Sequence, residues 1–424
     1  MRGCRDTRED IQHCARPFTP NPSPAPGRGE PSTNKAMSRR RQSLKILVAP
    51  NAFKESLSAI DAARAISKGV RRGLPNARVT EIPIADGGDG TLEAVISGTG
   101  GRILKARVMG PLGNRITAEY GITGDGKTAV IEMSRASGLA LVPPARRNPM
   151  RTTSFGTGQL IQAALDLGVN RILLGIGGSA TVDGGIGALQ ALGVSFMDLQ
   201  GKPVGHGGTG LLAIEKIDLS RLHPGLNRVE VLVACDVDNP LIGPKGAAAV
   251  FGPQKGATPA MVKQLDRGLA RLAILIAQAA GRRFERIPGT GAAGGIAGSF
   301  LGLLGARLRP GSELVFDLLK LDEIVPKMDW VITGEGQIDF QTQFGKGPGM
   351  LAKLAARHGV PVVGIAGSIA DNAGKLASKG FTALFSITNQ PMDLAAAMQR
   401  APRLMERIGE QVARLINACR KAEV

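Results

Sequence analysis

Residues 171–185 read RILLGIGGSATVDGG, and this stretch decides the class of fold. The apolar run after Arg171 is typical of a buried strand. The glycine-rich run Gly177–Gly185 follows it and leads into a helical pattern, so the stretch predicts a strand, a loop and then a helix. At such a loop, bare backbone amides can bind an anionic ligand.

Residues 78–91, RVTEIPIADGGDGT, repeat this order. They predict a strand over Arg78–Ala85 and a loop that opens a short helix. In that loop Asp86 and Asp89 bracket a Gly-Gly pair. Glycine amides and a helix N-terminus suit phosphate oxygens, and the carboxylates supply a magnesium ligand or a base for an acceptor hydroxyl. A tight turn explains either loop alone, but two such loops favour phosphate binding.

The chain from Leu44 alternates short β-rich runs with longer helical patterns, which predicts an α/β fold with a doubly wound parallel sheet. Residues 102–133 instead predict three strands separated by Gly-Pro and Gly-Asp-Gly turns, which indicates a mixed sheet. We therefore expect two α/β domains with a cleft between them. Residues 44–100 and 300–424 would form the first, and residues 101–299 the second, inserted one. We expect residues 1–43 to be a disordered basic extension. Alternatively, the start site is assigned too far upstream and the protein begins at Met37.

Residues 121–128, GITGDGKT, match the P-loop pattern GxxxxGK[ST]. A P-loop must open a helix, whereas Thr128–Met133 predicts a strand after a Gly-Asp-Gly hairpin turn. We therefore interpret Lys127 as a turn residue. Gly175–Ala180, with Asp198 further on, also fits a loose dinucleotide fingerprint, so an NAD-dependent oxidoreductase is an alternative function.

Composition limits the other classes of function. The net charge of +18 raises a nucleic-acid-binding alternative, but the charge has no long basic run and only 3% of residues are aromatic, so we expect no nucleic-acid partner. The four cysteines form no CxxC pair, and the N-terminus lacks a signal-peptide core, which favours a cytoplasmic protein. Residues 287–306 carry no charge, but seven of the 20 are glycine, so we expect a buried loop leading into a helix and no membrane span.

Further polar residues follow predicted strands, where open α/β sheets place their ligands. Asp236 and Asn239 come after the strand Val229–Cys235. Residues 333–339 repeat that arrangement after Trp330–Ile332 and contain Glu335 and Asp339, with Lys346 a short loop later. Lys54 and Ser56 follow the first strand, where the segment is either a capped helix start or the site of a phosphate-binding lysine.

Taken in order, these loops resemble the motifs of the bacterial glycerate kinase family. The similarity runs from residues 49–58, APNAFKESLS, through 85–91, 177–185, 234–240, 251–257 (FGPQKGA) and 333–339 to 364–367. The resemblance implies ATP and Mg²⁺, D-glycerate as phosphoryl acceptor, 2-phosphoglycerate as product and a site between two α/β domains. Three residues depart from the family pattern: Asn51 where Asp is usual, Val182 where Asn is common and Gln337 where Arg is common.

Within this family we assign roles to the polar residues of the loops. Asp86 is expected to orient or deprotonate the acceptor hydroxyl, with Lys54 and Asp183 as further catalytic residues. Asp183 and Asp236 are the predicted magnesium ligands. The predicted substrate-binding residues are Ser56, Asp89, Thr91, Asn239, Glu335, Asp339 and Lys346. The predicted phosphate-binding residues are Gly87, Gly88, Gly90, Gly177, Gly178, Ser179 and Thr181. The oligomeric state is not predicted.

Overall fold

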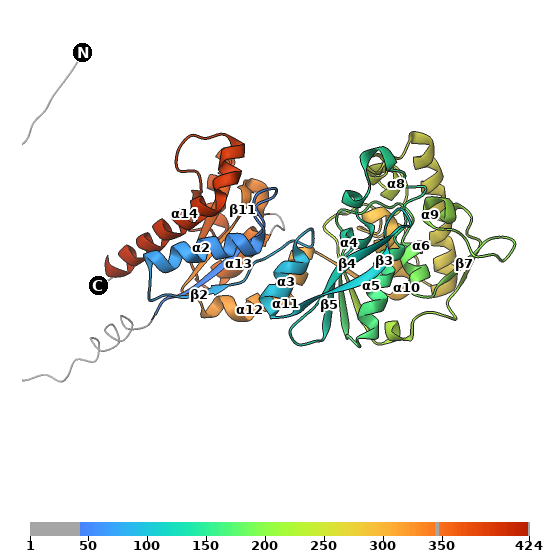
Figure 1. The fold of residues 1–424 in the computed structure, drawn as a ribbon, viewed down its shortest axis with the longest axis horizontal. Helices are drawn as coiled ribbons and strands as arrows, with labels where there is room; N and C mark the ends of the chain where they lie inside the picture. The colour runs from blue at the N-terminus through green and yellow to red at the C-terminus, as the bar shows by residue number, and fades with distance from the viewer. Residues whose placement is uncertain (1–42, 344–346, 423–424) are drawn as a thin grey trace, which may run out of the picture. The chain divides into compact units, whose positions relative to one another are not determined.

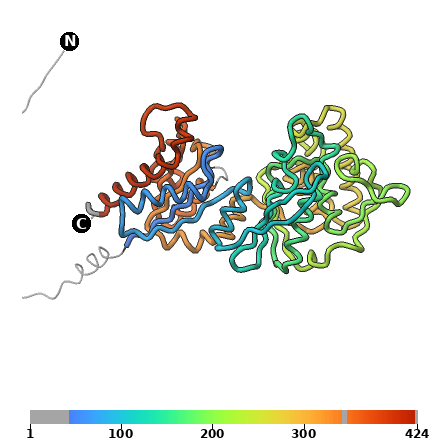
Figure 2. Tube along the Cα trace, in the orientation of Figure 1, coloured from blue at the N-terminus to red at the C-terminus, as the bar shows by residue number. Residues whose placement is uncertain are grey.

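The computed structural model describes residues 43–343 and 347–422, which form an α/β fold with two main sheets (Figure 1). The first sheet has five parallel strands in the order β13-β12-β11-β1-β2. These are β1 (Lys45–Pro50), β2 (Arg78–Glu81), β11 (Trp330–Ile338), β12 (Val362–Ile369) and β13 (Ala383–Ser386). This sheet joins the beginning and the end of the described chain, and Figure 2 shows the blue and the orange-to-red segments together in it.

Helices cover both faces of the first sheet. Ile46 and Val48 of β1 pack with α2 (Ala59–Gly73) and α14 (Leu394–Ala422), while Leu47 and Ala49 pack into a cluster on the opposite face. Successive strand side chains point to opposite faces, so an all-apolar strand needs a layer on each. The helices of that opposite cluster are α3 (Thr91–Thr99), α11 (Gly311–Leu319), α12 (Leu321–Ile324) and α13 (Gly347–Arg357). The predicted doubly wound parallel sheet is confirmed.

The second sheet is mixed, as predicted, in the order β10-β9-β6-β5-β4-β3. Its strands are β3 (Arg102–Met109), β4 (Arg115–Ile122), β5 (Thr128–Glu132), β6 (Arg171–Gly175), β9 (Glu230–Ala234) and β10 (Arg307–Arg309). The pairs from β10 to β5 are parallel, and β5, β4 and β3 are antiparallel. A separate two-stranded sheet pairs β7 (Ser195–Met197) with β8 (Lys216–Asp218).

Alternate residues of β5 and β6 belong to different cores. Val130 and Leu173 pack into the cluster that contains α3 and α11, and that cluster therefore extends from one sheet to the other. On the opposite face, Ile131 and Leu174 belong to a cluster formed with another group of helices. That group includes α5 (Phe155–Asp166), α6 (Ile186–Ala191), α7 (Gly207–Leu212), α9 (Pro259–Ala280) and α10 (Ile296–Leu304).

The segment that matches the P-loop pattern forms a hairpin turn. The Thr123 amide donates a 3.0 Å hydrogen bond to the Thr128 carbonyl, and Gly126 in the turn has a φ of +72°. Strands β4 and β5 on either side are antiparallel, and Lys127 is exposed. The interpretation of Lys127 as a turn residue is confirmed.

Two predicted strands have different ends in the structure. The predicted strand Arg78–Ala85 ends at Glu81, because Pro83 has no amide hydrogen to continue the ladder. The Ile82 and Ile84 amides still donate hydrogen bonds to carbonyl oxygens of β1. The strand predicted at Trp330–Ile332 continues to Ile338 as β11. The proposed domain division stays a prediction, and residues 1–42 of the expected extension lie outside the described residues.

The uncharged segment 287–306 contains a glycine-rich turn followed by α10, as expected. Across the described ranges, no helix combines the length and apolar character that a membrane crossing requires.

Candidate active site

The loop Asp86–Gly90 precedes α3 and is held by residues at the end of β5. The Leu92 amide donates a 3.0 Å hydrogen bond to Oε1 of Glu132, and the Ser134 hydroxyl donates one of 3.2 Å to Oδ1 of Asp89. Glu132 is buried, and this burial raises the pKa of its carboxyl, while the Leu92 amide and Arg135 oppose the rise. Because the N-terminal turn of a helix carries partial positive charge, an acidic group there stabilises it.

The first turn of α11 packs directly against this loop. A Cβ atom on Gly311 would lie 2.1 Å from the Asp86 carbonyl oxygen, and one on Gly87 would lie 2.8 Å from the Gly311 Cα. Gly87 also has a φ of +90°, which side chains other than glycine rarely adopt. Only glycine fits at both positions, and the position of Asp86 depends on that contact.

Asp236 lies beyond the end of β9 and caps α11. Its Oδ1 accepts a 3.0 Å hydrogen bond from the Gly311 amide. Partial burial raises the pKa of the Asp236 carboxyl, the Gly311 hydrogen bond opposes this, and the negative charges of Asp86 and Glu313 raise it further. Asp86 and Asp236 are therefore close enough to repel each other, which favours a cation beside them.

The loop Gly177–Gly185 follows β6 and contains Asp183, which is fully buried. Oδ2 of Asp183 accepts hydrogen bonds from the amide and the hydroxyl of Ser154, and Oδ1 accepts one from the Gly185 amide. These three contacts give Asp183 a structural role in holding the loop. Its proposed catalytic and metal-binding roles stay predictions.

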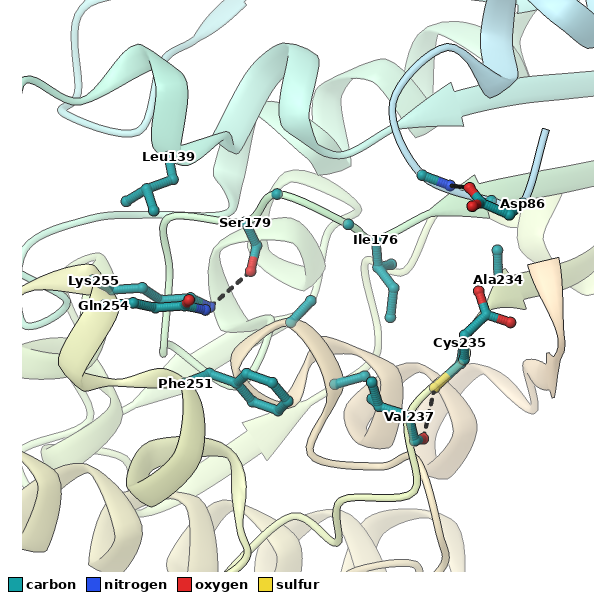
Figure 3. Close-up of a pocket in the computed structure, with 17 residues that line it drawn as sticks. Asp86, Leu139, Ile176, Ser179, Ala234, Cys235, Val237, Phe251, Gln254 and Lys255 are labelled. Atoms are coloured by element: carbon teal, nitrogen blue, oxygen red, sulfur yellow. Dashed lines mark hydrogen bonds between the residues drawn. The ribbon is translucent and has the colours of Figure 1, made fainter. Parts of the chain in front are cut away.

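Lys255 lies beneath the same loop. It ends the short 3₁₀ helix η4 (Pro253–Lys255), between α8 (Ala247–Phe251) and α9, and is 2% exposed. Its Nζ donates a 2.7 Å hydrogen bond to Oγ of Ser179 (Figure 3). It donates another of 2.7 Å to the carbonyl oxygen of Thr181. Burial lowers the pKa of Lys255 to about 7, although the charge of Asp183 acts in the opposite direction.

These elements surround a cavity of about 480 Å³, whose labelled lining residues appear in Figure 3. One part of its wall is polar and contains Asp86, Asp236 and Lys255. The apolar part of the wall consists of Leu139, Ile176, Ala234, Val237, Phe251, Ala292 and Ala293. A concave site with apolar walls and a few convergent polar groups is typical of a small-molecule ligand such as a nucleotide.

A second cavity, of about 1140 Å³, is also lined by residues of the Asp86 loop. Predicted site residues in its wall are Lys54, Ser56, Asp89 and Glu335, together with the family departures Asn51 and Gln337. Four residues line both cavities: Asp86, Gly88, Gly177 and Gly178. The two cavities therefore meet at the two glycine-rich loops, with Asp86 among the shared residues.

The remaining predicted site residues that the structure describes are not part of either cavity wall. These six residues line neither cavity: Gly90, Thr91, Thr181, Asp183, Asn239 and Asp339. The Asn239 side-chain amide donates to the Lys245 carbonyl, and the Asp339 amide donates to Oγ1 of Thr342. Thr181 is buried, and its carbonyl accepts a hydrogen bond from Lys255. Gly90 is the N-cap residue that precedes α3 and has a φ of +90°. Lys346 lies outside the described residues.

Comparisons with known proteins agree with this geometry. The model of the glycerate kinase family matches residues 46–417. The chain belongs to the glycerate kinase family. It is 49% identical to a glycerate kinase of Halalkalibacterium halodurans over 87% of this chain and 97% of that protein. It is 48% identical to the glycerate 2-kinase of Escherichia coli over 81% of this chain and 90% of that protein.

A solved structure gives the same result for the fold. The crystal structure of a protein assigned as glycerate kinase 2 from Salmonella typhimurium LT2 superimposes with a TM-score of 0.83. That protein is 47% identical, and the match covers 90% of this chain and all of the other. The family, the fold class and the kinase class of enzyme predicted from the motifs are therefore confirmed, and membership in the glycerate kinase family favours the kinase over the oxidoreductase alternative.

Two residues of the site were not predicted from the sequence. Gly311 carries no signal in the sequence, because its importance arises from contact with a loop more than 200 residues away in the chain. Lys255 lies within the family motif of residues 251–257, but no role was assigned to it. A single lysine between glycine-rich and apolar segments was the available signal, and only its burial in the structure distinguishes it from a surface lysine.

Proposed function

We propose that this protein transfers the γ-phosphoryl group of ATP to the 2-hydroxyl group of D-glycerate. The observation that carries this proposal is the junction of the two cavities at Asp86, Gly88, Gly177 and Gly178. A kinase must bring a nucleotide and an acceptor together at one point, in line for transfer. We assign the nucleotide to the cavity with the apolar wall and the acceptor to the cavity that contains Lys54 and Ser56.

The acceptor cavity offers groups suited to a small hydroxy acid. Lys54 is exposed in its wall and can neutralise a carboxylate. The adjacent residue Glu55 has a φ of +62°, a backbone conformation uncommon for a residue with a side chain and often found at functional loops. The Ser56 hydroxyl is held by the Met398 carbonyl at 3.3 Å. Gln337 stands in this wall where an arginine is common, so carboxylate binding relies more heavily on Lys54.

Asp86 is the group assigned to the reacting hydroxyl. In the transfer step, the hydroxyl oxygen forms a bond to the γ-phosphorus, its proton passes to the Asp86 carboxylate, and the bond to the leaving ADP breaks. The glycine amides of the two loops orient the phosphate oxygens. The phosphoryl group passes directly from ATP to the hydroxyl, without a covalent intermediate on the protein.

The residues beside the nucleotide cavity fit a magnesium ion. In proteins Mg²⁺ is usually held by one or two carboxylates, with nucleotide phosphates and waters as its other ligands. Asp236, with its charge close to that of Asp86, supplies such a carboxylate, and among the described residues no cluster of three His, Cys, Asp or Glu competes for it. When bound, the ion would neutralise charge on the phosphates.

The test is an ATP-consumption assay with a panel of small hydroxy acids, followed by phosphorus NMR of the product. We expect D-glycerate to be consumed and 2-phosphoglycerate to form, a position that the name of the E. coli relative supports. Formation of 3-phosphoglycerate would contradict the assignment of the 2-hydroxyl, and preference for another hydroxy acid would contradict the substrate. A cytoplasmic location and the lack of a nucleic-acid partner stay predictions.

A further inference from the structure

In the protein without nucleotide, the buried side chain of Lys255 has no counter-charge in contact with it among the residues that the structure describes. Its ammonium group is buried, and its two acceptors, the Ser179 hydroxyl and the Thr181 carbonyl, are both uncharged. No carboxylate in ranges 43–343 and 347–422 lies within ion-pair distance of it. Asp183 acts on it only at longer range, and both oxygens of Asp183 already accept hydrogen bonds. A buried charge without a counter-charge is costly.

The hydrogen bonds of Lys255 also leave one donor over. An ammonium group has three N–H donors, and the two acceptors account for two of them. Within the described part of the chain, the third has no acceptor. Lys255 lines the cavity assigned to the nucleotide, and Ser179 joins it there directly after the Gly177-Gly178 pair. An anion that enters this cavity would accept from the third donor and supply the counter-charge.

We propose that Lys255 is a phosphate ligand of the nucleotide, held under the glycine-rich loop by Ser179 and Thr181. This inference rests on the proposed kinase function and adds a residue for the phosphates of the donor, distinct from Lys54 in the acceptor cavity. The nucleotide phosphate supplies the counter-charge, and the loop amides of Gly177 and Gly178 bind other oxygens of the same group. The depressed pKa of the free protein agrees with a charge that is stabilised only when the phosphate arrives.

A purely structural role for Lys255 predicts different behaviour. If Lys255 served only to tie the loop to η4, its loss would destabilise the fold and weaken every ligand of the cavity alike. If Lys255 binds phosphate, its loss should weaken binding of ligands that carry phosphates and leave binding of a nucleoside unchanged. Removing a buried charge that has no counter-charge is expected to leave the stability of the free protein unchanged or higher.

The experiment compares wild type, Lys255→Met and the control Lys263→Met by calorimetric titration with ATP, ADP and adenosine. Lys263 is an exposed lysine on α9 and lines neither cavity. We expect Lys255→Met to lose about tenfold to a hundredfold in affinity for ATP and ADP, as for a lost charge-assisted hydrogen bond, and to bind adenosine as wild type does. Lys263→Met should match wild type with all three ligands.

Melting temperatures of the ligand-free proteins complete the test. We expect Lys255→Met to melt at or above the temperature of wild type. An equal loss of affinity for ATP and adenosine, together with a lower melting temperature, would overturn the proposal in favour of a structural role. Unchanged ATP affinity in Lys255→Met would also overturn it. If wild type itself bound no ATP, the proposed function would fail first, so the two failures are distinguishable.

Discussion

The Gly311 amide donates a 3.0 Å hydrogen bond to Oδ1 of Asp236. This bond joins the end of β9 to the start of α11, and the same glycine lies against the backbone of Asp86 and Gly87. Both carboxylates at the nucleotide cavity therefore have their positions set by the first residue of one helix. The arrangement places a candidate magnesium ligand close enough to the candidate base for their charges to interact.

Gly311→Ala tests this dependence. The added methyl group would lie 2.1 Å from the Asp86 carbonyl oxygen, so the loop must shift. Misplacement of a reacting group by about 1 Å can reduce turnover by about a hundredfold, and we expect a loss of that order with a modestly lower melting temperature. Gly205→Ala is the matched control, because a methyl group there meets nothing within 4 Å. Equal turnover in the two variants would show that the contact does not position Asp86.

Asp236→Asn tests the magnesium assignment. The asparagine oxygen can still accept the Gly311 hydrogen bond, but the negative charge is lost. We expect the magnesium concentration for half-maximal turnover to rise by about tenfold, with partial recovery of turnover at high magnesium. Asp238→Asn, at an exposed position two residues later, should behave as wild type. A loss of turnover in Asp236→Asn that is independent of magnesium would contradict the role of Asp236 as a ligand.

Lys127→Ala should leave turnover within a few-fold of wild type, because Lys127 is exposed in the β4–β5 turn and lines neither cavity. Steady-state kinetics with ATP and D-glycerate are sufficient to check this. A collapse of about a thousandfold, as for loss of a phosphate-neutralising group, would show that the P-loop pattern is functional after all.

The pKa of Lys255 predicts a pH dependence of stability. Because its pKa is lowered from 10.5 to about 7 on folding, the unfolded chain binds a proton between these values that the folded chain does not. Above pH 10.5 Lys255 is neutral in both states and its burial carries no charge penalty. As the pH falls towards 7, the unfolded chain gains the proton first, so the free energy of unfolding decreases. Asp183 is the charged neighbour that opposes the shift, and Arg147 packs its backbone on Gly256 next to Lys255.

Urea denaturation of wild type and Lys255→Met at pH 7, 8 and 9 measures this effect. We expect any stability advantage of the variant to be largest at pH 7 and to shrink as the pH rises. A difference in unfolding free energy that does not vary across this range would contradict the lowered pKa.

Local patterns predicted much of this structure, and tertiary contacts account for what they missed. The hairpin around Lys127 and the strand–loop–helix order of residues 171–185 depend on neighbouring residues, so the sequence was sufficient. The sequence did not reveal which carboxylates face a cavity. Asp183 is buried by its contacts with Ser154, 29 residues away, and Lys255 meets Ser179 across 76 residues. Such contacts follow from how the elements pack, which residue spacing does not determine.

The most direct test of the central claim is turnover of Asp86→Asn across a magnesium titration, measured beside wild type and Asp236→Asn. Asparagine keeps the shape of the side chain and removes its charge. If Asp86 acts on the acceptor hydroxyl, turnover should fall by about a hundredfold or more at every magnesium concentration, with little change in ATP affinity. Recovery at high magnesium would instead make Asp86 a metal ligand. Turnover close to that of wild type would contradict the account, since the residue at the junction of the two cavities would then have no part in the reaction.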